Sequence, residues 1–273
     1  PLVEILPLVF FLNKKRTIIN YHCLPEFPLY LKFVKLYFYF LGILAMINSK
    51  ILIVLSKDYF YQFPFHSFFS KKLLELPPYI NLPEIKNVKK TNDEKIFIGY
   101  LGRLCEEKGL EYLIRLSNHL ISINVNHELI IAGDFKDSRF KKYINNLEKI
   151  CKDNNNINFL GKINSLQKEK FFNRIDVFIF PSTNSFEAFG IVQLEAMSYG
   201  IPVVASNIRG VRSIIQNTKN GFLFRNKDMN DLIKKFIIFK EKNFDKNEIR
   251  KNLIKYYGKE IFKKKFSNLF KFF

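Results

Sequence analysis

Two glutamates with a regular spacing, Glu187 and Glu195, are the residues that first indicate chemistry in this sequence. They lie eight positions apart, and eight residues make a little over two turns of an α-helix. A helix that begins close to Glu187 would therefore present both carboxylates on one side of its N-terminal half. Carboxylates in that arrangement could accept hydrogen bonds from hydroxyl groups at two ends of one ligand.

The residues before Glu195 favour a phosphate as part of that ligand. The apolar segment 177–180 predicts a strand, which reaches a turn at Pro181 and Ser182 and continues as a helix. A strand that enters a helix through a tight turn offers backbone N–H groups and the positive helix end to an anion. The natural donors are the amides of Phe189, Gly190 and Ile191. Two carboxylates beside a phosphate would repel it unless each accepts from its own hydroxyl group, and a nucleotide sugar supplies hydroxyl groups on both sides.

A longer run of residues carries a family resemblance. The pattern Pro-Ser-x4-Glu-x-Phe-Gly-x4-Glu-Ala-x3-Gly-x-Pro-Val-Val-x-Ser begins at Pro181 and ends at Ser206. It resembles the signature of the family 4 retaining glycosyltransferases of the GT-B fold, within the glycosyl transferases group 1. Residues 96–110 are similar to the opening of that family's C-terminal domain, and further landmarks match at residues 129–134, 157–161 and 220–224.

The resemblance implies a role for each matched residue. Arg103 and Lys108 match the basic pair on the donor diphosphate, where a guanidinium can hold two oxygens and an ammonium adds a compact charge. Glu187 resembles the residue that accepts hydrogen bonds from the transferred sugar and stabilises positive charge at its anomeric carbon, and Glu195 the acid that holds the ribose hydroxyls. The expected catalytic residues are Glu187, His22, Arg103 and Lys108. The expected donor-binding residues are Gly102, Arg103, Lys108, Lys162, Ile163, Ser182, Glu187, Phe189, Gly190, Ile191 and Glu195.

Two of these assignments depend on position more than on a motif. Lys162 and Ile163 follow a predicted strand at the place where the family packs the nucleobase. His22 follows a predicted strand whose counterpart ends in a histidine that faces the donor sugar. A histidine that simply ends a strand is the alternative for His22.

The formal net charge of +19 raises nucleic acid and anionic membrane as further partners. The basic residues form short scattered runs, and no recognition helix, RNA-binding sheet or zinc finger accompanies them, so no nucleic-acid partner is expected. An anionic membrane surface would suit an enzyme with a lipid-linked or envelope acceptor. We therefore expect a cytoplasmic protein with peripheral contact to the inner face of the cell membrane.

Cysteine and histidine spacing predicts neither a disulfide nor a metal site. Cys23, Cys105 and Cys151 are isolated and odd in number, as in a reducing cytoplasm. The four histidines show no ligand spacing, and no Asp-x-Asp motif is present. We expect no metal and no cofactor, the nucleoside-diphosphate sugar being a substrate.

Apolar and helical segments alternate from residue 96 onward, which predicts a parallel sheet covered on both faces. Strands are expected near residues 96–101, 128–132, 157–160, 177–180, 202–205 and 222–224. Helices are expected near residues 108–123, 137–152, 165–174, 189–199, 210–216 and 228–241. Ligands of such sheets bind outside the carboxyl ends of the strands.

The N-terminal third is predicted in less detail. Residues 17–21 and 49–56 are predicted strands, and residues 58–74 are a helix or a loop. Residues 36–47 form an apolar helix that is too short to span a bilayer. Burial is the expectation for a helix that is apolar all round, and partial insertion into a membrane is the alternative.

The predicted fold class is α/β of the GT-B type, with two Rossmann-like doubly wound domains of which the N-terminal one is only partly present. The expected units are a partial acceptor-side domain over residues 1–88, a nucleotide-sugar-binding domain over 89–257 and a helix over 258–273 that crosses back. Residues 1–88 are fewer than a doubly wound domain usually needs, and the family's glycine-rich N-terminal loop is missing. The sequence is therefore expected to be either a fragment of a longer enzyme or a naturally truncated chain.

The resemblance implies a retaining glycosyltransferase that moves a sugar from a nucleoside-diphosphate sugar to a glycan or lipid-linked envelope acceptor. Two alternatives stay open. One is a catalytically silent donor-binding fragment or pseudoenzyme, and the other is a basic membrane- or nucleic-acid-binding protein without enzymatic activity. The sequence identifies neither the base, nor the sugar, nor the acceptor.

Overall fold

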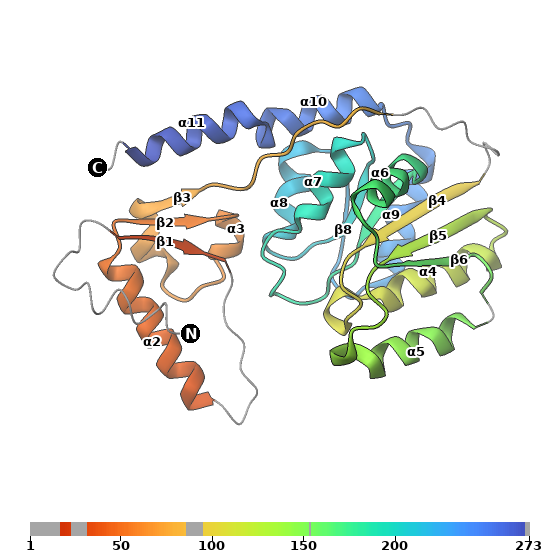
Figure 1. Cartoon of the computed structure of the whole chain (residues 1–273), viewed down its shortest axis with the longest axis horizontal. Helices are drawn as coiled ribbons and strands as arrows, with labels where there is room; N and C mark the ends of the chain where they lie inside the picture. Colours follow the sequence, from red (N-terminus) through yellow and green to blue (C-terminus); the bar gives the residue numbers. More distant parts are fainter. Residues whose placement is uncertain (1–16, 23–31, 86–94, 153, 271–273) are drawn as a thin grey trace.

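The computed structural model of the protein describes residues 17–22, 32–85, 95–152 and 154–270. They form a small parallel sheet and a large parallel sheet, each covered by helices (Figure 1). The residues of 17–75 that belong to the small sheet and its helices are called the small-sheet unit below. Residues 95–257, around the large sheet, are called the large-sheet unit.

The large sheet contains six parallel strands in the order β6-β5-β4-β7-β8-β9. The strands are β4 (Ile96–Leu101), β5 (His127–Ala132), β6 (Ile157–Gly161), β7 (Val177–Phe180), β8 (Val203–Ser206) and β9 (Gly221–Phe224). The chain adds strands outward from β4 to β6 and then returns to place β7 on the other side of β4. The carboxyl ends of β4 and β7 therefore flank the point where the strand order reverses, which is where open α/β sheets bind ligands.

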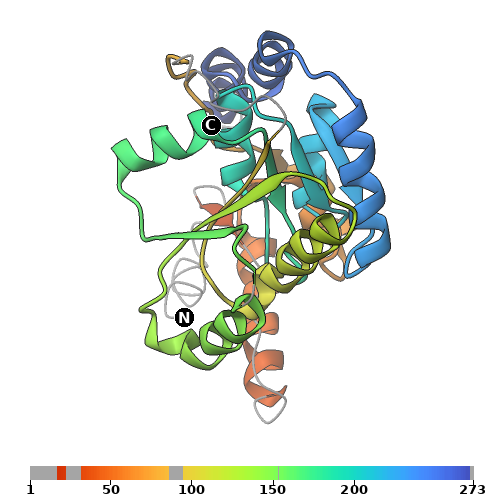
Figure 2. The ribbon, with the colours of Figure 1, turned by 90° about the vertical axis from the view of Figure 1, so that its right-hand side faces the viewer.

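Helices cover both faces of the large sheet, because each parallel crossover must pass over a face. One layer contains α4 (Leu110–Ser122), α5 (Lys141–Cys151) and α9 (Met229–Glu241). The other contains α6 (Ser165–Arg174), α7 (Ile191–Ser198), α8 (Val211–Thr218) and α10 (Lys246–Tyr257). Figure 2 shows helices on both sides of the strands. The core therefore consists of two apolar layers, with Leu113 and Phe236 buried in one and Phe172 and Leu194 in the other.

The small sheet has the order β1-β2-β3, and its strands are again parallel. They are β1 (Ile18–Tyr21), β2 (Ile51–Val54) and β3 (Leu73–Glu75). Between β2 and β3 lie the short helix α3 (Lys57–Phe60) and a 3-10 helix (His66–Lys72). Aromatic rings fill this core, where Phe60, Phe63 and Phe69 are buried against one another.

The apolar helix of the small-sheet unit, α2 (Lys32–Asn48), is less buried than its composition predicts. Leu41, Ala45 and Met46 are buried, but Phe33 and Leu36 are 87% and 68% exposed. The expectation of a fully buried helix is wrong, because only one face of α2 packs against the sheet. No helix in the described part of the chain is both long and apolar enough to cross a bilayer.

The two units are joined by an extended segment and by the C-terminal helices. After β3 the chain runs along α10, where the N–H of Ile80 donates to the carbonyl oxygen of Tyr257 and Arg250 donates to that of Pro83. The last helix, α11 (Lys259–Phe270), continues from α10 toward the small sheet (Figure 1). Its Leu269 is buried against β2.

Candidate active site

The candidate site lies at the carboxyl ends of β4 and β7, where the strand order reverses. Two segments meet there: the loop 102–109 after β4 and the loop 181–190 after β7, called the donor loop below. They come from positions far apart in the sequence, and the pairing of Ile98 and Gly99 with Val177 and Phe178 brings them together.

Backbone contacts hold these two loops against each other. The hydroxyl of Tyr100 donates to the carbonyl oxygen of Arg103 at 2.8 Å and shapes the first loop. The N–H of Thr183 donates to the carbonyl oxygen of Glu107 at 2.9 Å. Gly109 has a φ of +66°, and a Cβ there would lie 2.3 Å from the carbonyl oxygen of Pro181. Only glycine allows this close approach, which places Lys108 beside the donor loop.

The contact of the loops creates a cluster of charged side chains. Lys108 forms an ion pair with Glu187, and their side chains are only 13% and 17% exposed. Arg103 pairs with Glu107 at 2.8 Å. Arg103, Lys108 and Glu187 line one cavity of about 90 Å³. Within this cavity the cations are neutralised by carboxylates, so a bound phosphate would replace these carboxylates as the partner of the cations.

A second cavity, of about 200 Å³, shares Arg103 with the first. Gly102, Lys162 and Ile163 also line it, together with Asp134. The structure thus brings together the loops after β4, β5 and β6. The residues that the sequence assigned to the nucleobase lie next to those assigned to the diphosphate.

Two backbone N–H groups at the start of α7 are unpaired within the described residues. Gly190 precedes the helix with a φ of +79° and no side chain caps it. The N–H groups of Phe189 and Gly190 donate to no protein acceptor in the described part of the chain. The ring of Phe189 is buried and contacts Tyr257 with its centroid 5.9 Å away. The side chain of Phe189 therefore belongs to the core.

Glu195 has a partner that the sequence did not indicate. Lys168 of α6 donates to Glu195 Oε1 at 2.9 Å, and the two side chains are 38% and 28% exposed. This pair holds the Glu195 carboxylate on α7 through Oε1, while Oε2 accepts from no donor in the described part of the chain. Lys168 was missed because it lies in an ordinary helical pattern, 27 residues from Glu195.

Six predicted residues line none of the cavities at the site, namely His22, Ser182, Phe189, Gly190, Ile191 and Glu195. Ser182 is 1% exposed, its carbonyl oxygen accepts from Ser206 at 2.5 Å, and its hydroxyl has no partner among the described residues. His22 is exposed at the end of β1. Ser182 therefore connects the donor loop to the end of β8 through Ser206. The structure does not bring His22 into the charged cluster.

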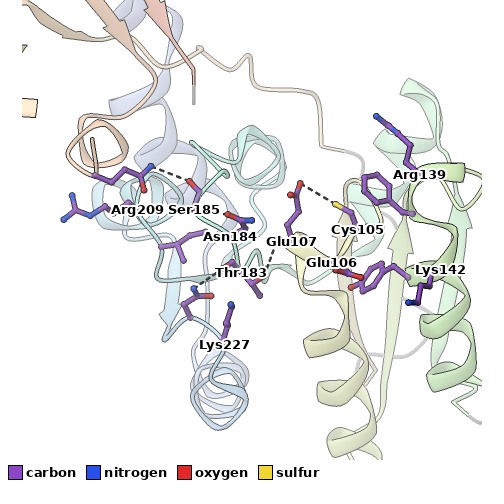
Figure 3. A pocket seen from close by; sticks show the side chains of 15 residues that line it. Cys105, Glu106, Glu107, Arg139, Lys142, Thr183, Asn184, Ser185, Arg209 and Lys227 are labelled. Atoms are coloured by element: carbon purple, nitrogen blue, oxygen red, sulfur yellow. Dashed lines mark hydrogen bonds between the residues drawn. The ribbon is translucent and has the colours of Figure 1, made fainter. Parts of the chain in front are cut away.

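A further hollow near the site, of about 980 Å³, was not predicted (Figure 3). It shares Glu107 and Asn184 with the charged cavity. Gln62 of the small-sheet unit forms part of its wall. Cys105 also lines it, but burial and the nearby Glu107 carboxylate raise the pKa of this thiol to about 11. A protonated thiol is a poor nucleophile.

Within the described residues, the cysteines and the acidic groups form no cluster of metal ligands. Cys105 and Cys151 are free thiols, as predicted, and Cys23 lies outside the described residues. Among the described residues, no group of three histidine, cysteine or acidic side chains is arranged to hold a metal ion.

Comparison with known proteins agrees with this geometry. The protein-family model "Glycosyl transferases group 1" matches residues 82–260. An uncharacterized glycosyltransferase of Methanocaldococcus jannaschii, MJ1607, is 38% identical over 135 residues, which are 48% of this chain and 32% of the relative. The capsular polysaccharide biosynthesis glycosyltransferase CapM of Staphylococcus aureus is 27% identical over 188 residues, covering 69% of this chain and 46% of the relative. The chain thus spans less than half the length of these curated relatives.

Solved structures share the fold at low sequence identity. Anabaena Alr3699/HepE in complex with UDP superposes with a TM-score of 0.76 at 18% identity, over 98% of this chain and 76% of that chain. Sucrose-phosphate synthase from Thermosynechococcus elongatus gives a TM-score of 0.75 at 19% identity, over 98% of this chain and 71% of that chain. The predicted GT-B fold is confirmed. Since the family model covers more than half of the sequence, the chain belongs to the glycosyl transferases group 1 family.

Proposed function

We propose that this chain carries the donor site of a family 4-like retaining glycosyltransferase, which moves a sugar from a nucleoside-diphosphate sugar to a glycan or lipid-linked acceptor. One observation supports the proposal above the others. Arg103, Lys108 and Glu187 line a single cavity at the strand-order reversal, although Glu187 is 79 residues from Lys108. A diphosphate needs two cations of this kind, and the sugar needs a carboxylate next to them.

This geometry is best suited to stabilising the leaving group of the reaction. Arg103 and Lys108 would stabilise the negative charge that grows on the diphosphate as the bond to the sugar breaks. The free N–H groups of Phe189 and Gly190 would add oriented dipoles. Glu187 would exchange its contact with Lys108 for hydroxyl groups of the sugar and stabilise the positive anomeric carbon.

The remaining proposed roles concern recognition. Glu195, held by Lys168, would accept from the ribose hydroxyls. Gly102, Lys162 and Ile163 would form the wall against which the base packs. His22 keeps its proposed place opposite the donor sugar. We also propose the domain division at residues 88 and 257, and a reaction that needs no metal.

Relatives support an envelope glycan as the acceptor. CapM of Staphylococcus aureus is named for capsular polysaccharide biosynthesis. A second relative from that organism, 27% identical over 202 residues, is a poly(ribitol-phosphate) alpha-N-acetylglucosaminyltransferase. We propose that the chain acts on a polymer or lipid-linked glycan of this general class, on the cytoplasmic side of the membrane.

Contact with an anionic membrane is part of this proposal. Phe33, Leu36 and Phe40 lie along one exposed face of α2, and this helix contains no acidic residue. Aromatic and aliphatic side chains of this kind enter the interfacial layer of a bilayer, while the overall charge of +19 attracts anionic headgroups.

A catalytically silent donor-binding chain is the second candidate. Such a chain would bind nucleotide sugars without turnover.

Binding and turnover together test the proposal. UDP-, GDP- and ADP-glucose are titrated by calorimetry, and release of nucleoside diphosphate is followed in the presence and absence of a glycan acceptor. Arg103→Ala should weaken nucleotide binding by about tenfold or more, whereas Arg115→Ala, which removes an exposed arginine of α4, should not. Glu187→Gln should abolish turnover and keep the nucleotide affinity. Binding of no nucleotide sugar would refute both candidates, and binding without turnover would favour the second.

A further inference from the structure

A carboxylate of the small-sheet unit reaches the large-sheet unit beside the donor site. Asp58 lies in α3, directly after β2, and accepts hydrogen bonds from Arg212 Nε at 2.9 Å and Nη2 at 2.6 Å. The same carboxylate accepts from the N–H of Gly210 at 2.9 Å. Arg209 donates to the carbonyl oxygen of Asp58 at 3.5 Å. A bidentate arginine–carboxylate pair fixes the relative orientation of the two side chains as well as their distance.

The environment keeps this pair ionised. The side chains of Arg212 and Asp58 are 28% and 23% exposed. Burial opposes the charge of Asp58, but hydrogen bonds from Arg212 and Gly210 and the charges of Arg212 and Arg209 lower its pKa below the ordinary value. A partly buried pair with three donors resists solvent and salt better than an exposed pair does.

The residues that Asp58 holds are packed directly on the donor loop. A Cβ on Gly210 would lie 2.2 Å from the carbonyl oxygen of Ala188, so the two backbones are in close contact. Gln193 is fully buried, and its amide donates to the carbonyl oxygens of Phe189 at 3.3 Å and Val211 at 3.4 Å. The segment 209–212 and the end of the donor loop are therefore packed against each other.

A second contact from the small-sheet unit reaches the beginning of the same loop. Gln62 follows α3 and donates to the carbonyl oxygen of Ser185 at 3.5 Å. Gln62 and Ser185 both line the large cavity, in which Figure 3 labels Ser185. The small-sheet unit thus contacts the donor loop, directly or through Gly210, on both sides of Glu187.

We propose that Asp58 is a positioning residue, which holds the segment 209–212 against the donor loop and so fixes the Glu187 carboxylate opposite Lys108. This role rests on the proposed function, and it adds a residue of the small-sheet unit to a site built by the large-sheet unit. Glu187 is bonded to Ala188, and Ala188 touches Gly210, so a displacement at Gly210 reaches the carboxylate through one packed contact. Small errors in the placement of a reacting group lower rates strongly.

The test compares Asp58→Asn with a matched control. Asparagine has nearly the same shape but lacks the charge that holds Arg212. The control, Arg250→Gln, removes a 2.7 Å hydrogen bond from Arg250 of α10 to the carbonyl oxygen of Pro83. This bond also joins distant parts of the chain, but it does not contact the donor loop. We expect Asp58→Asn to lower kcat for nucleotide-sugar turnover by about tenfold to a hundredfold, with the affinity for UDP within about twofold of wild type. Asp58→Glu should recover part of kcat, and Arg250→Gln should change neither quantity.

A second measurement needs no activity. Hydrogen–deuterium exchange of residues 182–190, without ligand, should be faster in Asp58→Asn than in wild type and in Arg250→Gln. If wild type turns over no nucleotide sugar, the proposed function fails and the exchange experiment alone decides the role of Asp58. Exchange equal to that of Arg250→Gln would overturn the positioning role. So would a parallel loss of UDP affinity, kcat and thermal stability, since that pattern indicates general destabilisation.

Discussion

Replacing Gly109 by alanine tests whether the two loops of the site must touch. Gly109 has a φ of +66°, and an L-residue in that region costs about 1–2 kcal/mol. The new Cβ would also lie 2.3 Å from the carbonyl oxygen of Pro181, a backbone atom that cannot rotate away. Overpacking of this kind costs about 1–3 kcal/mol. The free energy of unfolding should therefore fall by about 2–5 kcal/mol.

Gly161→Ala is the control that separates the two contributions. Gly161 has a φ of +70°, but no heavy atom lies within 4 Å of the position that a Cβ would take. Its replacement should cost only the conformational part, about 1–2 kcal/mol. Urea unfolding of wild type and both variants, followed by circular dichroism, measures the difference. Equal losses in the two variants would refute the reasoning, because the contact with Pro181 would then contribute nothing.

Three further predictions concern other parts of the chain. Because the pKa of Asp58 is lowered in the folded protein, its stabilising effect is present above about pH 4 and is lost as the pH falls through the folded value. Wild type should thus lose more unfolding free energy than Asp58→Asn on acidification, and parallel curves would contradict this. Cys105, with a pKa raised to about 11, should resist iodoacetamide in the native protein and react after unfolding, as peptide mass spectrometry would show; rapid native labelling would be the contrary result. In vesicle flotation the chain should bind phosphatidylglycerol-containing vesicles, and Phe33→Ser with Phe40→Ser should weaken binding by about tenfold or more. Leu166→Ser, at a residue 72% exposed on α6, is the control, and equal loss there would contradict a role for α2.

The large sheet was predictable because its strands are buried on both faces and its connections are helices. Short apolar runs such as residues 177–180 leave no other interpretation when they alternate with amphipathic segments. Strand β7 has the bounds that the sequence predicted, and α6 does as well. The start of α5 lies later than expected, because residues 138–140 form a 3-10 turn before Lys141.

The small-sheet unit was harder to predict. Aromatic residues dominate the segment between β2 and β3, and their pattern follows neither the helical nor the strand period. Its 3-10 helix is set by ring packing around Phe63 and Phe69. The exposure of α2 was missed for a related reason, since a helix that is apolar on all sides does not indicate which side meets the sheet.

The site was predictable where a local motif exists and unpredictable where charges meet over long distances. Arg103, Lys108 and Glu187 each stand in a motif, and the structure places them in one cavity. Lys168 and Asp58 belong to no motif. Their partners are 27 residues away in one case and 154 in the other. Such pairs depend on how helices and loops are set against one another, which a single sequence does not specify.

The strand pairing at the centre of the large sheet has a consequence for how a ligand would act on the whole fold. Only Ile98 with Val177 and Gly99 with Phe178 are paired between β4 and β7, whereas β4 and β5 are paired over six residues. The pairing of β4 with β7 is therefore the shortest strand pairing in the large sheet. A ligand held by both loops would connect β4 and β7 across this short pairing and stabilise the folded protein by an amount that rises with the logarithm of its concentration relative to Kd. Local opening between β4 and β7 would then be rarer in the ligand-bound protein than in the free protein.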